Sequence, residues 1–164
     1  MAKDVEIKWN DEAIKKIQEA IASNASVKIG ILSNEPLHSE DSLGAVDLGA
    51  IHEFGSISRN IQERSFIRLT ESQRKDDYEA WVLKNKNKIF EAVVKDGLSS
   101  ILPKIGALWV GYVKNTFRTS GYGKWKELSK KTKMNRTKGK RKGPIKPLID
   151  TGALMNSITY EVVE

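Results

Sequence analysis

Residues 98–113 constrain the fold of this chain most, because they carry apolar side chains at helical spacing through about four turns. Pro103 is compatible with a helix here because it falls in the first turn, where backbone amides have no intrahelical partner. Gly106 and Gly111 each cost about 1 kcal/mol relative to alanine, so they either allow close helix contact or are simply tolerated. The pattern predicts one long helix over about residues 98–116, with apolar positions Leu98, Ile101, Leu102, Ile105, Leu108, Trp109, Tyr112 and Val113.

A small sheet is predicted beside this helix. Three segments alternate apolar and polar side chains, which is typical of half-buried strands: residues 4–9, 27–31 and 158–162. The stretch RSFIRLT (64–70) favours a short strand or an extended segment with Phe66 or Ile67 facing inward. We therefore expect a small antiparallel or mixed sheet packed by amphipathic helices, an α+β fold, in a single domain over residues 1–164.

Three further helices follow from apolar spacing and end signals. Asn10 is a suitable N-cap for a helix with isoleucines at positions 14, 17 and 21. A second helix is expected to end at Gly55, and a third covers about residues 71–94 and is interrupted at Gly97. Residues 33–44 and 56–62 are rich in turn formers and are predicted to be loops.

Positive charge is concentrated in one segment. The chain has a formal net charge of +7, yet residues 118–146 alone hold twelve Lys/Arg and a single acid, Glu127. We predict a flexible, exposed basic loop there, because this composition cannot bury enough apolar surface. It is either a solvated, solubilising loop or a contact for DNA or an acidic protein surface. The candidate contact residues are Lys130, Lys131, Lys133, Arg136, Lys138, Lys140, Arg141 and Lys142.

No residue pattern indicates an enzyme, a metal site or a cofactor. Absence of cysteine excludes disulfides and thiolate chemistry, and the pair His52–Glu53 has Ser56 where a zinc-protease helix needs its second histidine. A hydrolase that uses His52 and Glu53 is a weaker alternative. No apolar run approaches the ~20 residues of a membrane span, and the charged N-terminal stretch lacks a signal-peptide core. We expect a soluble protein of the cytoplasm.

The stretch PLIDTGALMNSI (147–158) contains the Asp-Thr-Gly string of aspartic proteases. Only twelve residues follow Gly152, which is too few for the flap and strands that such an active site needs. A structural role fits better: Asp150 is predicted to be the N-cap of a helical turn, with Ile149 and Leu154 as a hydrophobic staple. Loss of this cap would cost about 1 kcal/mol.

Three stretches together resemble a known family: AIHEFGSISRNIQERSFIR (50–68), WKELSKKTKMNRTKGKRKGPIKPLIDTGAL (125–154) and SITYEV (157–162). In this order they are similar to the virion morphogenesis, or tail-completion (neck), proteins of Mu-like phages. Gln62 and Ser65 depart from the family pattern, which frequently has proline at both positions. The matching positions are His52, Glu53, Phe54, Gly55, Arg64, Phe66, Trp125, Asp150, Thr151, Gly152, Leu154 and Ser157.

The resemblance implies a non-enzymatic structural protein at the head–tail junction or tail end. Such proteins share a small α+β fold and form rings, often hexameric, against neck connector, tail terminator or tail-tube proteins. The expected location is the virion, with the host cytoplasm as the place of assembly and no membrane contact. The same resemblance fits a prophage-derived particle or a contractile injection machine. A separate alternative from the charge pattern is a nucleic-acid-binding module that uses residues 118–146 without sequence specificity.

Overall fold

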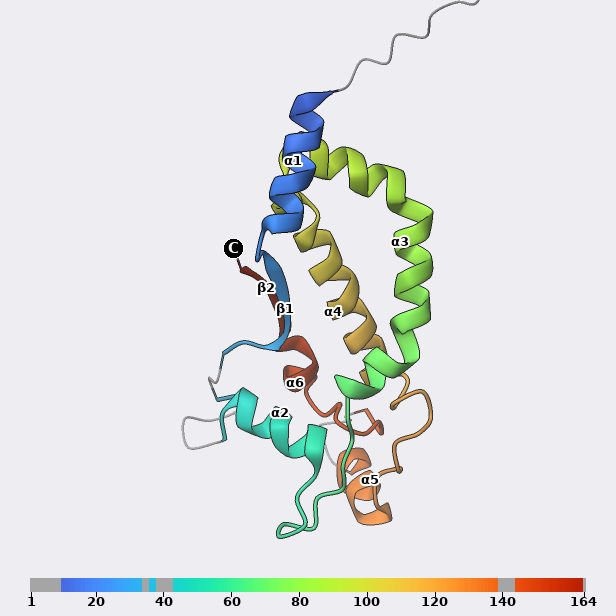
Figure 1. The fold of residues 1–164 in the computed structure, drawn as a ribbon. Helices are drawn as coiled ribbons and strands as arrows, with labels where there is room; N and C mark the ends of the chain where they lie inside the picture. Colours follow the sequence, from blue (N-terminus) through green and yellow to red (C-terminus); the bar gives the residue numbers. More distant parts are fainter. Residues whose placement is uncertain (1–9, 34–35, 38–42, 139–143, 164) are drawn as a thin grey trace, which may run out of the picture.

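Helix α4 (Leu102–Arg118) is the centre of the fold and lies between a two-stranded sheet and helix α3 (Arg68–Asp96) (Figure 1). The structure is a computed structural model that describes residues 10–33, 36–37, 43–138 and 144–163. A short 3₁₀ turn, η1 (Leu98–Ser100), precedes α4, and Pro103 lies in the first turn of the helix. The predicted long helix is therefore confirmed, and so is the α+β class.

The sheet pairs two strands that are far apart in the sequence. Strand β1 (Ser26–Ile31) runs antiparallel to β2 (Ile158–Val163), and Val27 lies opposite Val162. A Cβ atom on Gly106 of α4 would lie only 2.5 Å from the ring of Tyr160, so this glycine lets the helix approach β2 closely. The strand predicted over residues 4–9 lies outside the described residues.

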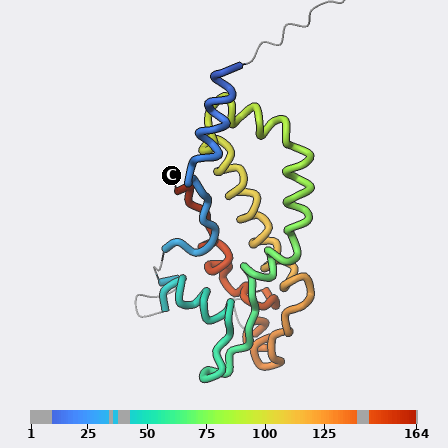
Figure 2. The backbone as a smooth tube through the Cα atoms, in the orientation of Figure 1, coloured from blue at the N-terminus to red at the C-terminus, as the bar shows by residue number. Residues whose placement is uncertain are grey.

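Helix α1 (Asp11–Ala22) begins as predicted, because the Asn10 side chain accepts a hydrogen bond from the amide of Ala13 at 3.1 Å. It packs beside the C-terminal end of α3, where Lys16 Nζ donates to the carbonyl oxygen of Lys95 at 3.2 Å. Figure 2 follows the chain from α1 down to the opposite end of the molecule and back to β2, which ends close to β1. The two halves of the sequence therefore meet in the sheet.

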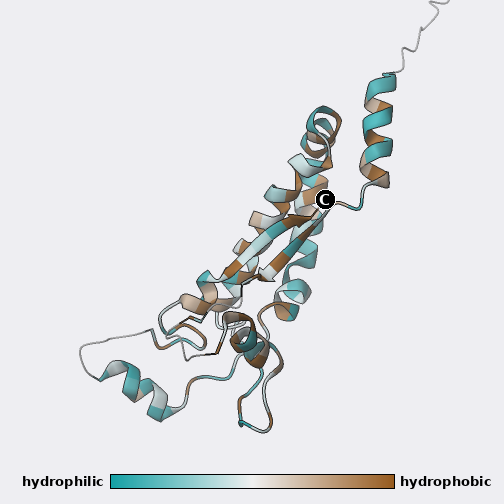
Figure 3. Cartoon of the chain, turned by 90° about the vertical axis from the view of Figure 1, so that its left-hand side faces the viewer, coloured by the Kyte–Doolittle hydropathy of each residue, from teal (hydrophilic) through white to brown (hydrophobic). Residues whose placement is uncertain are grey.

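A small core fills the end of the molecule remote from α1. Phe117 of α4 contacts Phe66 with ring centroids 4.9 Å apart and Trp125 with centroids 5.8 Å apart. Leu154 and Ile158 complete this cluster from the C-terminal side. Figure 3 shows the hydrophobic residues along the two strands and the mixed surface of the helices around them.

A buried polar network joins α3 to α4. The hydroxyls of Thr70 and Thr116, both almost fully buried, are 2.6 Å apart. Thr116 also bonds to the Tyr122 hydroxyl at 3.2 Å, and Arg74 Nε donates to the same hydroxyl at 3.0 Å. Because each buried hydroxyl has a partner, the network fixes the relative position of the two helices without leaving an unpaired group.

Two sequence predictions differ from the structure. The stretch 64–70 is not a strand: the chain bends at residues 66–67, and α3 starts at Arg68. Nor is 118–146 a loop throughout. It contains the helix α5 (Lys130–Thr137) and, before this helix, a tight turn in which Trp125 is buried. Ser129 begins α5 by accepting a hydrogen bond from the amide of Thr132, a local cap that charge counting does not detect.

Candidate functional site

The positions that carry the family resemblance gather around one end of α2 (Ala45–Phe54), the start of α3, and α6 (Ala153–Asn156) (Figure 1). Glu53 organises this end, although it is charged and only 6% exposed. Its Oε2 accepts hydrogen bonds from the amides of Phe66 at 2.6 Å and Ile67 at 2.9 Å. Its Oε1 accepts from the amide of Arg68 at 3.1 Å and from the hydroxyl of Ser65 at 2.6 Å. Glu53 thus caps α3 from a different helix.

This capping explains where α3 begins. The residue at its N-cap position, Ile67, has no side-chain acceptor, so the first amides need a partner from elsewhere. Arg68 Nε also donates to Glu53 Oε1 at 3.2 Å, so Glu53 forms an ion pair with this arginine. Five donors on a carboxylate with about four lone-pair directions use its whole capacity to accept hydrogen bonds.

The electrostatics of Glu53 follow from these bonds. Burial opposes its ionisation, but the hydrogen bonds from Ile67, Ser65, Arg68 and Phe66 outweigh burial and hold the pKa of Glu53 below its ordinary value. The positive end of the α3 dipole acts in the same direction. The carboxylate is therefore charged in the folded protein at neutral pH.

His52 and Arg64 lie beside this cap. The carbonyl oxygen of His52 accepts a hydrogen bond from the amide of Arg64 at 2.8 Å. Burial, and then the positive charge of Arg64, lower the pKa of His52 below its ordinary value. The imidazole is thus neutral at pH 7. His52 Nδ1 and Arg64 Nε are both buried and have no hydrogen-bond partner within the described part of the chain.

The other motif positions near α3 have packing roles. Gly55 has φ +74°, and a Cβ there would lie 2.9 Å from the amide nitrogen of Glu63, so the turn after α2 requires glycine. Phe54 is 65% exposed, with the guanidinium of Arg68 4.8 Å above its ring. Of the two residues predicted to face inward, Phe66 or Ile67, Phe66 is the buried one and Ile67 is only partly buried. Trp125 is buried and donates from Nε1 to the carbonyl oxygen of Ser65 at 3.1 Å.

Asp150 is not the helix cap that the sequence predicts. The N-cap position of α6 is Gly152, with φ +82°, and it makes no side-chain cap bond. The amide of Ala153 instead bonds to the Thr151 hydroxyl at 3.2 Å. Asp150 pairs with Arg136 Nε of α5 at 3.7 Å, and because α6 begins only at Ala153, Asp150 lies two residues before the N-cap position.

The last motif positions anchor α6 to the core. Leu154 is buried in the core cluster, and the Ser157 hydroxyl donates to the carbonyl oxygen of Leu154 at 2.8 Å. The Asp-Thr-Gly string therefore contributes one ion pair and one backbone turn, and the leucine two residues after it contributes to the core.

The predicted basic contact residues fall into four groups. Arg136 has a structural role, because its Nη1 lies within 3.0 Å of the carbonyl oxygens of Pro144, Lys146 and Ile149. Lys133 pairs with Glu127. Lys130, Lys131 and Lys138 are exposed on or next to α5 with no ion pair among the described residues, whereas Lys140, Arg141 and Lys142 lie outside them.

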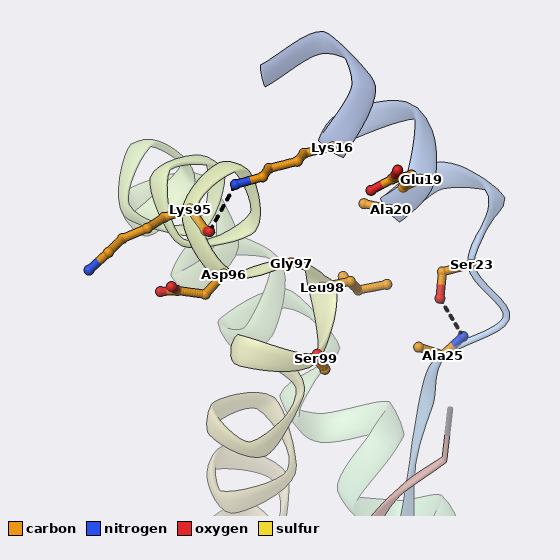
Figure 4. A pocket seen from close by; sticks show the side chains of 10 residues that line it. All are labelled: Lys16, Glu19, Ala20, Ser23, Ala25, Lys95, Asp96, Gly97, Leu98 and Ser99. Atoms are coloured by element: carbon orange, nitrogen blue, oxygen red, sulfur yellow. Dashed lines mark hydrogen bonds between the residues drawn. The ribbon is translucent and has the colours of Figure 1, made fainter. Parts of the chain in front are cut away.

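A hollow of about 530 Å³ lies at the opposite end, between α1 and the turn Gly97–Ser99 (Figure 4). Glu19 and Asp96 line it, but the hydrogen bond from Lys16 to Lys95 is the polar contact that spans it. Within the described ranges no cluster of three His, Asp or Glu side chains is placed to hold a metal ion. The helices described are also too short or too polar to cross a membrane.

Ser65 and Arg68 are the side chains at this junction whose contacts with Glu53 sequence reasoning missed. A serine just before an apolar helix is a known start signal, and here the Ser65 hydroxyl donates to Glu53 and accepts from the amide of Leu69 at 3.3 Å. Its distant partner Glu53 is visible only in the folded structure. No family model matches this chain, and no characterised protein or solved structure is significantly similar to it.

Proposed function

We propose that this chain is a structural virion assembly protein of a phage neck or tail end, active in tail completion or head–tail joining. It forms an oligomeric ring, of the often hexameric kind, and contacts neck connector, tail terminator or tail-tube proteins. It works without catalysis or cofactor, in the virion and, during assembly, in the host cytoplasm.

The observation that carries this proposal is the convergence of the resembling segments on one structural junction. Ser65 bonds to Trp125, and Arg64 Nη2 donates to the carbonyl oxygen of Lys126 at 3.4 Å, so the first and second segments touch. The ion pair of Arg136 with Asp150 ties α5 to the turn before α6 within the second segment. The resembling residues thus support one another mechanically, as expected of a structural protein.

The surface also favours assembly. Large apolar side chains are exposed on several elements, among them Ile21 of α1, Leu83 and Phe90 of α3, and Ile57 in the loop after α2. Ile21 and Phe90 line one apolar hollow between α1 and α3, and a contiguous exposed apolar patch of this kind marks a contact site for a partner. We therefore expect the molar mass in solution to be that of a ring of several copies.

Multi-angle light scattering tests the proposal, on the purified chain alone and mixed with connector, terminator and tail-tube proteins of the same particle. We expect a ring-sized species in at least one of these mixtures. A strict monomer that joins none of these proteins would refute the proposal.

A second candidate function is DNA binding without sequence specificity. The observation in its favour is the set of lysines without an ion pair in the described part of α5 and its C-terminal end, namely Lys130, Lys131 and Lys138, next to further basic residues in the sequence. Such a surface releases counterions from duplex DNA, with a salt slope of about 0.9 per phosphate contact.

Fluorescence anisotropy with duplex DNA at several salt concentrations tests this alternative. Alanine at Lys138, Lys140, Arg141 and Lys142 is expected to lower both affinity and salt slope. In the matched control, alanine replaces Lys84, Lys86, Lys88 and Lys95. This variant removes the same number of positive charges from α3 instead of from the basic segment. Absence of binding at low salt eliminates this function.

A further inference from the structure

A hollow of about 310 Å³ lies between α2, α5 and α6, and His52 is one of the residues that line it. Four leucines make its lining mainly apolar: Leu48, Leu128, Leu148 and Leu154. Three basic side chains also line it: His52, Arg64 and Arg136. An apolar hollow with a few polar groups is the usual form of a small-ligand site.

The two arginines differ in how many of their N–H donors have an acceptor. Arg136 bonds to three carbonyl oxygens and pairs with Asp150, so its charge is already compensated. Arg64 makes one long side-chain hydrogen bond, to the carbonyl oxygen of Lys126, and has no carboxylate within 4.0 Å among the described residues. A guanidinium has five N–H donors, so most of its capacity is unused.

Because Arg64 has no carboxylate partner among the described residues, its positive charge acts on the neighbouring His52. Its charge lies close enough to His52 to lower the pKa of the imidazole, and both groups keep a buried nitrogen without a partner in the described part of the chain. Unsatisfied buried donors are rare in folded proteins and call for a missing partner. An anion at Arg64 would compensate its charge and relieve the repulsion on His52.

We propose that this hollow binds a carboxylate carried on a short aliphatic group, with the carboxylate paired to Arg64 and the aliphatic carbons among the leucines. A carboxylate suits the planar fork of arginine, which it meets through two parallel bonds. Inorganic phosphate fits less well, because the leucines would remove its water without supplying further donors. The carboxylate belongs either to a free acid or to a side chain of a second copy.

The test uses the full chain with isotope-labelled histidine, observed by NMR. The probe is isovalerate, and its control is isovaleramide, which has the same shape without charge. We expect isovalerate to shift the His52 signal saturably, with a Kd on the order of millimolar, and to raise the pKa of His52. Arg64, Arg136 and Asp150 are the charged groups that line the hollow with it.

Variants assign the effect to Arg64. Arg64→Gln is expected to weaken isovalerate binding about tenfold or more, whereas Lys138→Gln removes the same charge outside the hollow and leaves binding unchanged. A His52 shift that grows with protein concentration without added acid, and is lost in Arg64→Gln, identifies a second copy as the source. Absence of this concentration dependence, with isovalerate still binding, identifies a free acid.

Three outcomes overturn the proposal: no saturable shift of His52 by isovalerate and none with protein concentration, an equal response to isovaleramide, or tighter binding of phosphate than of isovalerate. The comparison of acid with amide needs only the wild-type chain, so it stands even if Arg64→Gln does not fold. The site and the proposed ring can be tested separately. A chain that is a monomer by light scattering but still binds isovalerate would support the site and contradict the ring.

Discussion

Replacement of Glu53 by glutamine exchanges one side-chain oxygen for an NH₂ group and is expected to cost much of the stability of the fold. In the wild type the carboxylate accepts from three backbone amides, one hydroxyl and one guanidinium nitrogen. Whichever way the new side-chain amide turns, its NH₂ group faces at least two donors. Each buried donor without an acceptor costs about 1–3 kcal/mol.

The expected loss is therefore about 3–5 kcal/mol, since breaking a buried charged network at one partner costs this much. A domain of this kind is stable by about 5–15 kcal/mol, so the variant loses a large share of its stability and unfolds at much lower urea. The free energy of unfolding is measured from urea titrations followed by circular dichroism.

Glu63→Gln is the matched control. Glu63 also pairs with Arg68, at 2.9 Å, but both side chains are about half exposed. An exposed ion pair contributes at most about 1 kcal/mol, so this variant stays near wild type. If Glu53→Gln lost no more stability than Glu63→Gln, the carboxylate would not be what holds the start of α3.

Three further predictions use the same unfolding measurement. Because the pKa of Glu53 is lower in the folded than in the unfolded chain, its stabilisation is present above pH of about 4.3 and disappears as the pH falls through the folded pKa; a Glu53→Gln variant with the same acid-dependent loss would contradict this. Gly106→Ala should destabilise by about 1–3 kcal/mol because its Cβ meets Tyr160, whereas Gly111→Ala, with no atom within 4 Å, should stabilise by up to about 1 kcal/mol; equal effects would show that α4 does not need close contact. Asp150→Ala should cost less than about 1 kcal/mol, the range of a half-exposed ion pair, and a larger loss would restore its role as a cap.

Periodicity was sufficient to predict the elements whose identity depends on near neighbours. The apolar spacing of residues 98–113 predicted α4, and alternation predicted both strands of the sheet. The cap at Asn10 was also predictable, because donor and acceptor are three residues apart. These signals depend on residues that are close together in the sequence.

The roles of Glu53 and Asp150 could not be predicted from the sequence, because both depend on contacts that only the folded chain brings together. Glu53 caps amides that lie 13 to 15 residues further along the chain, and only the packing of α2 brings them together. Asp150 has the residue type of a cap, but α6 begins only at Ala153, and the Asp150 carboxylate pairs with Arg136 instead. The high charge density of residues 118–146 likewise predicted a loop. The cap at Ser129 and the hydrogen bonds of Arg136 instead stabilise helix α5 in this segment.

The pairing of β1 with β2 has a consequence for how the chain folds. Val27 and Val162 are joined across nearly the whole chain, and closing such a loop costs about 4 kcal/mol of chain entropy. Contacts within α3, η1 and α4 are local and can form before that closure, whereas the sheet forms only when both distant segments meet. Folding is therefore expected to be limited by this long-range step, so slow refolding would report on the sheet rather than on the helices.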